Sequence, residues 1–194
     1  MSIDSAFQTF PRLETENLIL REIWPADVKA VFDILSDDEV TRFYDDDPFT
    51  NVSQASELVE YWTTSFASNR CIRWGIVRKS GVTVSDGAII GTCGYYGFHT
   101  WHMRASLGYE LARSFWRRGI MTEALSAVIE FGFEEAGLNR IQADVMPENQ
   151  ASVKLLERLG FKNEGLLREY ERWSSKGYVD LFAFSLLKRE YKRT

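Results

Sequence analysis

The amino-acid sequence predicts a single mixed α/β or α+β domain. Runs rich in β-branched and aromatic residues alternate with segments whose apolar residues recur at helical spacing. No repeat, linker or low-complexity stretch interrupts the 194 residues, a length typical of one domain. This order of elements places residues 1–194 in one unit built from strands and helices together.

The first strand is predicted within 10–23, where the β-prone run Leu-Ile-Leu-Arg follows a turn-forming Glu-Thr-Glu. Pro25 then introduces a helix over 26–35, whose apolar residues lie three and four apart. Asp27, near its start, suits the positive end of the helix dipole. The polar segment 37–48 ends in proline, so we predict a loop there.

A second helix is predicted after Asn51 or Ser53, either of which can cap it. Two β-like runs follow, at 71–77 and 88–98. The residues between them, 79–87, contain the Ser, Gly and Asp that suit a hairpin turn.

The middle of the chain predicts a strand over 105–111, then a helix over 122–136 that Gly137 ends, then a strand over 140–146 with alternating apolar residues. A further helix is predicted over 151–159. Two closing strands follow, at 161–173 and 178–187, separated by a turn at 174–177.

The composition excludes several classes of protein. A formal net charge of −5 argues against a nucleic-acid-binding protein with a broad basic face. Two cysteines and two histidines are too few for a disulfide framework or a His/Cys metal site, and we expect Cys93 to pack rather than act as a nucleophile. No stretch approaches the ~20 apolar residues of a membrane span, and 1–11 lacks the features of a signal peptide. A cytoplasmic location is therefore expected.

The most informative segment is 116–124, which reads Trp-Arg-Arg-Gly-Ile-Met-Thr-Glu-Ala. A helix is predicted to begin close to Thr122, so its unpaired N–H groups and positive dipole end face the preceding turn and can bind an anion. Gly119 lets the backbone approach such an anion closely, and Arg117 and Arg118 add positive charge. A glycine before a helix can also simply make the turn. The glycine spacing is that of neither a P-loop nor a dinucleotide-binding motif.

This segment resembles the phosphate-binding motif of the GCN5-related N-acetyltransferase (GNAT) superfamily, in the branch typified by bacterial ribosomal-protein alanine N-acetyltransferases. The superfamily motif has glutamine or arginine, two residues, glycine, one residue, and glycine or alanine. Here Trp116 and Met121 occupy the outer positions around Gly119, and Thr122-Glu123-Ala124 follows as in that branch. Further matches occur in the same order along nearly the whole chain, at 13–21, 89–91, 107–109, 149–161, 164–165 and 177–180.

The resemblance implies the GNAT fold: one strongly twisted mixed β-sheet, helices on both faces, and two parallel central strands, 105–111 and 140–146, that splay apart. Acetyl-CoA (coenzyme A) would be the acetyl donor, with its pyrophosphate at the turn and its pantetheine paired with exposed backbone in the gap. The cofactor-binding residues that the resemblance implies are Leu111, Ala112, Arg113, Trp116, Arg117, Arg118, Gly119, Ile120, Met121, Thr122, Asn149 and Ser152.

The implied reaction is acetyl transfer to a primary amine by direct attack through a tetrahedral intermediate. Glu110 is the first candidate for general base, because strand alternation could turn it toward the acceptor; it could equally be an ordinary exposed carboxylate, with a water chain as the base. Ser152 is assigned to a hydrogen bond with the departing sulfur. Asn149 is assigned to the pantetheine or the acceptor geometry, with helix capping as its structural alternative. Tyr109 and Tyr178 are alternative acids.

The acceptor is predicted to be a protein N-terminal α-amine, as on a ribosomal protein. An acidic loop at Asp45, Asp46 and Asp47 can attract a cationic amine. Aromatic residues are available beside it, namely Tyr44, Phe49, Trp62, Trp101 and Trp173. Two alternatives stay open: an acetyltransferase for a small amine such as a polyamine, amino acid or aminoglycoside, and an acyl-CoA-binding module without turnover. Nothing in the sequence decides whether the chain forms a homodimer.

Overall fold

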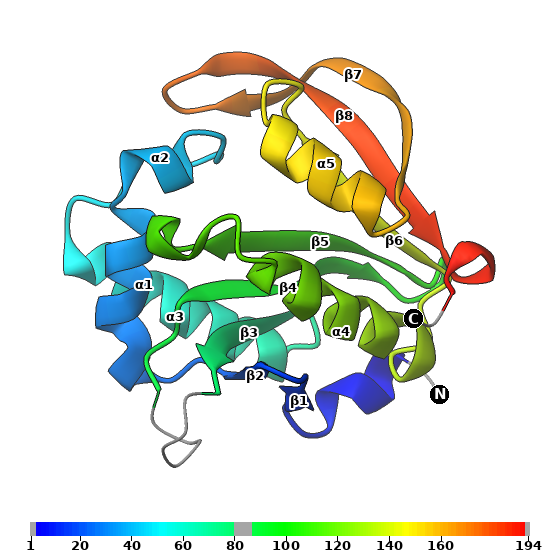
Figure 1. The fold of residues 1–194 in the computed structure, drawn as a ribbon, viewed down its shortest axis with the longest axis horizontal. Coiled ribbons are helices and arrows are strands. Elements are labelled where there is room, and N and C mark those ends of the chain that lie inside the picture. The colour runs from blue at the N-terminus through cyan, green and yellow to red at the C-terminus, as the bar shows by residue number, and fades with distance from the viewer. Residues whose placement is uncertain (1–2, 80–86, 193–194) are drawn as a thin grey trace.

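The computed structural model describes residues 3–79 and 87–192, and its centre is an eight-stranded sheet (Figure 1). The strands are β1 (Leu13–Glu14), β2 (Leu18–Glu22), β3 (Cys71–Arg78), β4 (Gly91–His99), β5 (Arg104–Leu111), β6 (Arg140–Val145), β7 (Lys162–Trp173) and β8 (Gly177–Leu187). Their order across the sheet is β1-β2-β3-β4-β5-β6-β8-β7. The β5–β6 pair is parallel and the other neighbouring pairs are antiparallel. The predicted mixed sheet is therefore confirmed.

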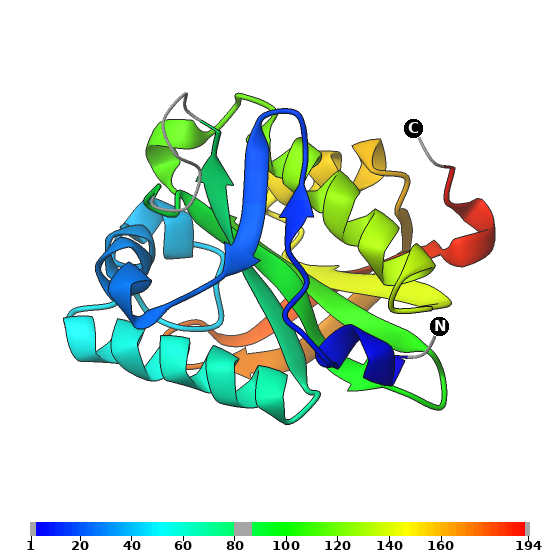
Figure 2. The ribbon, with the colours of Figure 1, turned by 90° about the horizontal axis from the view of Figure 1, so that it is seen from below.

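Helices cover both faces of this sheet, as expected. The α-helices are α1 (Val28–Leu35), α2 (Asp38–Thr41), α3 (Val52–Ala67), α4 (Ile120–Glu134) and α5 (Gln150–Arg158). Short 3-10 helices lie at η1 (Ile3–Phe7), η2 (Pro25–Asp27), η3 (Arg113–Phe115) and η4 (Lys188–Glu190). Figure 2 shows α1 and α3 against one face and α4 and α5 on the opposite side. None of the helices among the described residues is long and apolar enough to cross a bilayer.

The two larger hydrophobic cores lie one on each face, and a small third cluster of Trp173, Val179 and Leu181 lies in the C-terminal hairpin. Successive strand side chains point to opposite faces, so Leu20 and Ile72 enter the larger core with α4 and α5, while Ile19 and Val77 pack with α1 and α3. Strands β2 and β3 are consequently buried on both sides along most of their length, whereas β6 alternates between buried and partly exposed residues.

The parallel strands β5 and β6 separate soon after they begin. Their ladder comprises three pairs, from Arg104–Arg140 to Ser106–Gln142, although β5 continues to Leu111 and β6 to Val145. Beyond Ser106 the two strands diverge, which opens the sheet at its middle. The splayed arrangement of the central strands is thus present.

Several boundaries differ from those predicted, including the strand expected at 88–98, which is β4 (Gly91–His99). Helix α4 begins at Ile120 rather than Thr122, because Gly119 adopts a left-handed conformation that can start a helix directly. The segment 37–48 is not entirely a loop, since Asp37 caps the one-turn helix α2 through the N–H of Glu39. The antiparallel pairing of β3 with β4 matches the expected hairpin, but most of its predicted turn, 80–86, lies outside the described residues.

Candidate functional site

The turn before α4 has the geometry of an anion site. Arg117 and Gly119 both have positive φ, +60° and +77°, and Gly119 is the N-cap of α4 without a side-chain cap hydrogen bond. The first N–H groups of an α-helix lack partners within it, and the dipole there is positive. A Cβ added at Gly119 would meet no atom within 4 Å, so the start of the helix is open. These features fit a phosphate bound by backbone donors.

The side chains around this turn divide into two groups. Those of Ile120 and Met121 are buried in the α4 core, so only their backbone can face a ligand. Arg117 and Arg118 are exposed, and the Arg118 guanidinium lies 5.6 Å from the Phe115 ring centroid. Met121, which departs from the superfamily motif, therefore projects into the core.

Trp116, the other departure from the motif, ties the turn to the sheet. Its indole Nε1 donates to the carbonyl oxygen of Leu111 at 2.7 Å. The Ala112 N–H donates to Ile90 on the β4 side at 2.8 Å. Neighbouring strand residues direct their backbone groups to opposite edges, so Leu111 faces the β6 edge. Its carbonyl, expected to be free for pantetheine, is already bonded within the chain.

The start of α4 is also held by the turn between β1 and β2, at one edge of the sheet. Glu123 accepts hydrogen bonds from the Thr15 hydroxyl, from the Asn17 N–H at 2.8 Å and from the Asn17 side chain at 3.3 Å. Burial opposes the charge, but these bonds hold the pKa of Glu123 below its usual value. A negative charge in the first turn suits the helix dipole. The carbonyl of Thr122, beside Glu123, accepts a hydrogen bond from the Ser126 hydroxyl.

Asn149 and Ser152 lie together at the start of α5, directly after the splayed end of β6. The Asn149 side chain accepts from the Ser152 N–H at 3.2 Å and so caps the helix. Ser152 is partly buried, and burial raises the pKa of Tyr109 on β5 to about 12 against the opposing effect of a hydrogen bond with Ser152. The structure thus brings Ser152 and Asn149 to the gap opposite β5.

Glu110 points to the α1–α3 side of the sheet and is not the exposed carboxylate that was its structural alternative. It is 5% exposed and forms an ion pair with Arg73. It also accepts hydrogen bonds from the hydroxyls of Tyr44 and Thr92. Burial opposes the charge on Arg73, but the Glu110 charge raises the pKa of Arg73 above its ordinary value. Both oxygens of the Glu110 carboxylate are therefore engaged by side chains of the protein.

Further negative charge collects on the same side of the splayed strands. Burial, then the nearby charges of Asp144 on β6, Glu171 on β7 and Asp45, raise the pKa of Tyr96 to about 12, against the opposing charge of Arg73. Burial and then Glu171 likewise raise the pKa of Asp144. The charges of Asp144, Glu171 and Asp45 therefore act on the same tyrosine. Together with Asp46 and Asp47, the chain neighbours of Asp45, we call them the acidic face (Asp45, Asp46, Asp47, Asp144 and Glu171).

The C-terminal hairpin reaches the acidic loop across this region (Figure 1). Lys176 Nζ donates to the Tyr44 carbonyl at 2.7 Å, and the Ser174 hydroxyl lies 3.5 Å from an Asp47 carboxylate oxygen. Trp173 is buried beneath the hairpin, and its indole donates to Glu171 at 2.9 Å. The acidic face thus lies between the loop after α2 and the β7–β8 turn.

The other predicted acceptor aromatics are placed differently. Phe49 and Trp62 pack with the α1–α3 core. Trp101 is 86% exposed in the turn before β5, at the opposite end of that strand from the phosphate-binding turn. Tyr178 is exposed on β8. Cys93 is fully buried, and burial raises the pKa of its thiol to about 12, which does not suit a nucleophile.

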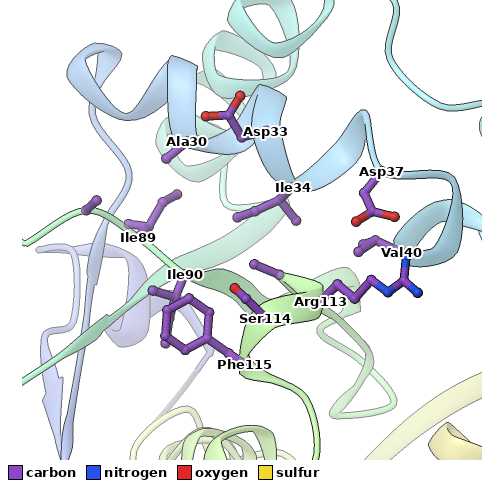
Figure 3. Close-up of a pocket in the computed structure, with 12 residues that line it drawn as sticks. Ala30, Asp33, Ile34, Asp37, Val40, Ile89, Ile90, Arg113, Ser114 and Phe115 are labelled. Atoms are coloured by element: carbon purple, nitrogen blue, oxygen red, sulfur yellow. The ribbon is translucent and has the colours of Figure 1, made fainter.

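An open cavity of about 770 Å³ adjoins the phosphate-binding turn on the α1 side (Figure 3). Ile34, Ile90 and Phe115 form part of its apolar wall. Arg113 extends along it toward Val40 and Asp37 rather than toward the start of α4.

The partners of Glu110 were missed by sequence reasoning, as were Asp144 and Glu171. Tyr44, Arg73 and Thr92 lie 66, 37 and 18 residues from Glu110, so only the strand register reveals them. Asp144 could have been found, because it alternates with the apolar residues of a predicted strand and so had to face the opposite side.

The comparisons with known proteins agree with this geometry. A family model described as "Acetyltransferase (GNAT) domain" matches residues 17–162. The chain is 38% identical over 179 residues to the uncharacterized N-acetyltransferase YoaA of Bacillus subtilis, covering 92% of this chain and 98% of that protein. It is 41% identical over 64 residues, 33% of each chain, to the Escherichia coli [ribosomal protein uS5]-alanine N-acetyltransferase.

A solved structure of RimJ from Mycobacterium smegmatis, in complex with CoA-disulfide, has a TM-score of 0.77 and 24% identity, covering 91% of this chain and 85% of that one. The likeness shows the shared fold. The open start of α4 and the splayed strands β5 and β6 are the features of this chain that fit such a ligand. The chain therefore belongs to the GNAT acetyltransferase family and is an acetyl-CoA-dependent N-acetyltransferase.

Proposed function

We propose that this enzyme acetylates the N-terminal α-amine of a protein, as the name of the E. coli relative states for ribosomal protein uS5, and that it does so in the cytoplasm. The observation that carries the proposal is the acidic loop at 45–47, which the C-terminal hairpin contacts through Ser174 and Lys176. Concentrated negative charge attracts a cationic group and raises its local concentration. A protein N-terminus, especially one followed by basic residues, has that charge.

The lower pKa of an α-amine favours it over a lysine side chain as the acceptor. The attacking nitrogen must be neutral, and an α-amine with a pKa near ~8 loses its proton more readily at neutral pH than a lysine near ~10.4. Glu110 is already bonded to Arg73, Tyr44 and Thr92, and in this proposal it is not the base. An α-amine does not require a strong base, because it loses its proton more readily than a lysine. In this proposal the nitrogen attacks the acetyl carbon, the carbon–sulfur bond breaks, and the amine proton leaves through water.

The donor would be held by the residues at the two edges of the gap. The N–H groups of Ile120 and Met121, with Arg117 and Arg118 at the rim, fit the pyrophosphate. On the other side of the gap, Ser152 at the start of α5 is proposed to face the sulfur, and Asn149 fixes the helix that carries it. Acetyl-CoA supplies the activated acetyl group.

Glu110 enters the proposal as a positioning residue. Its carboxylate joins β3, β4 and β5 to Tyr44, whose chain neighbours are the acidic loop. Glu110 therefore holds the acidic loop in place through its hydrogen bond with Tyr44. Burial and then the Glu110 charge raise the pKa of Tyr44, so the Tyr44 hydroxyl keeps its proton and remains a donor to Glu110.

Release of free CoA thiol from acetyl-CoA, measured across a panel of amines, tests the proposal. The panel contains peptides with neutral and basic N-terminal sequences, the same peptides with a blocked α-amine, polyamines, amino acids and aminoglycosides. We expect turnover with the peptides that have a free α-amine and none with the blocked ones. Turnover with small amines alone would establish the other acceptor class.

A further inference from the structure

The β7–β8 turn places an ammonium group against the start of the acidic loop. Lys176 Nζ donates to the Tyr44 carbonyl at 2.7 Å, although the two residues are 132 positions apart in the sequence. The same Nζ lies 5.2 Å from the ring centroid of Trp173, close enough for a cation–π interaction. The chain itself therefore supplies a cation beside Asp45, which directly follows Tyr44.

The charge of Lys176 acts on the acidic loop as the charge of a bound ligand would. Burial, then the charges of Asp45 and Asp47, raise the pKa of Asp46, and the charge of Lys176 opposes this shift. The Ser174 hydroxyl, on the same turn, lies 3.5 Å from an Asp47 carboxylate oxygen. The negative charge of the loop is thus partly neutralised by the protein before an acceptor binds.

The Lys176 contact can be exchanged at small cost. The Lys176 side chain is exposed at the turn, and interactions of exposed charges contribute little to stability because water solvates both partners. Tyr44 does not depend on Lys176 for its position, since its N–H donates to the Thr41 carbonyl at 2.9 Å and its hydroxyl donates to Glu110. The carbonyl that accepts the Lys176 ammonium would therefore stay in place after Lys176 leaves.

We propose that Lys176 is a specificity-determining residue: its ammonium occupies the position that a basic side chain of the acceptor takes on binding, and the two cations compete for it. The inference rests on the proposed function, in which the acceptor is a protein N-terminus. It narrows the acceptor to chains with a lysine or arginine close behind the N-terminal residue.

The acceptor group that replaces Lys176 is not the amine that is acetylated. The attacking nitrogen must be neutral, whereas a group that replaces an ammonium must carry charge. Tyr44 links the two positions, because its hydroxyl bonds to Glu110 on β5, a strand that borders the proposed thioester gap, and its carbonyl bonds to Lys176. An extended chain advances ~3.5 Å per residue, so the second or third residue of the acceptor suits the Lys176 position.

Steady-state kinetics with two peptides tests the competition. Both peptides have the same free α-amine, and their second and third residues are arginine in one and glutamine in the other. Lys176→Met removes the charge while keeping the length of the side chain. We expect KM for the arginine peptide to fall about twofold to fivefold at low salt, the size of an exposed charge interaction. KM for the glutamine peptide and kcat for both should stay unchanged.

Two further variants serve as controls. Lys176→Arg keeps the competing cation and should retain the wild-type KM for both peptides. Lys162→Met makes the same change in net charge at the other end of β7, where Lys162 pairs with Glu190, and should also leave both KM values unchanged. The effect of Lys176→Met should diminish as salt is added, because exposed charges are screened.

The outcomes separate the inference from the proposed function. A rise in both KM values in Lys176→Met would show that Lys176 only holds the loop, and unchanged values would show that it does not compete with the acceptor. Either result, or an equal fall in Lys162→Met, would overturn the role of Lys176 while leaving a peptide acceptor in place. Absence of turnover with both peptides in the wild type would instead overturn the proposed acceptor class, and the role of Lys176 with it.

Discussion

The carboxylate of Glu110 is ion-paired with the guanidinium of Arg73 inside the protein, where these residues are 5% and 9% exposed. Removing one partner of a buried pair strands the other charge. We therefore expect Glu110→Gln to lower the free energy of unfolding by about 3–5 kcal/mol, measured by urea denaturation. Asp33→Asn, which breaks the exposed pair with Lys29, is the control and should cost less than about 1 kcal/mol.

The same variant distinguishes a positioning residue from a base. If Glu110 positions the acidic face, Glu110→Gln should raise KM for the amine and leave the acid limb of the pH–rate profile in place. Loss of a general base typically lowers the rate ~10²–10⁴-fold and removes that limb. A flat profile with unchanged amine KM would return Glu110 to the role of base.

Gly119→Glu places a carboxylate at the open start of α4. We expect at least ~100-fold weaker CoA binding by calorimetry, because the introduced charge competes with the pyrophosphate for the same N–H groups. Gly177→Glu provides a matched control, since Gly177 also has positive φ, +72°, and open space around its Cβ position. Gly177→Glu should show comparable backbone strain but unchanged CoA affinity. Equal affinities in both variants would contradict the phosphate assignment.

Asp45, Asp46 and Asp47 should act on the acceptor alone. The pKa of Asp46 is raised by burial and by the charges of its two acidic neighbours. The three carboxylates therefore repel one another, and a bound cationic amine would reduce that repulsion. Replacing all three with asparagine should raise KM for a basic N-terminal peptide, most at low salt, without altering acetyl-CoA affinity. An unchanged KM would remove this loop from acceptor binding.

Acid should loosen the C-terminal half of the sheet in a defined range. Arg140 and then Ser185 hold the pKa of Glu164 at about 2, below its usual 4.5. A carboxyl group whose pKa is lower in the folded than in the unfolded state stabilises the fold at any pH above the unfolded pKa. For Glu164 this stabilisation is lost as the pH falls from about 4.5 to about 2. Wild-type stability should therefore fall more steeply than that of Glu164→Gln over this range. The difference should be modest, because Glu164 is 43% exposed.

Sequence patterns predicted the elements well where a single local signal decides them. The run before Gly137 and the splayed strands fall close to their expected places. The predicted start of α4, Thr122, lies two residues after the observed one, because the left-handed conformation of Gly119 is not visible in a helical pattern. Segment 10–23 divides into β1 and β2 around a turn that Thr15 and Glu123 hold.

The site was predictable only where its chemistry lies on adjacent residues. The phosphate-binding turn is one continuous segment, so its residues could be named. The surroundings of Glu110 depend on strand register and on Tyr44, far away in sequence. Alternation suggested only that Glu110 could turn toward the acceptor, and it could not reveal the three side chains that donate to its carboxylate. The bond from Trp116 to Leu111 is likewise a tertiary contact that no spacing rule anticipates.

A crystal structure of the enzyme with CoA bound is the most direct test of where the donor lies. The account predicts pyrophosphate oxygens within hydrogen-bonding distance of the N–H groups of Ile120 and Met121, and the thiol between β5 and β6 beside Ser152. A CoA molecule bound elsewhere, with the first turn of α4 contacting only solvent or the chain's own side chains, would contradict it.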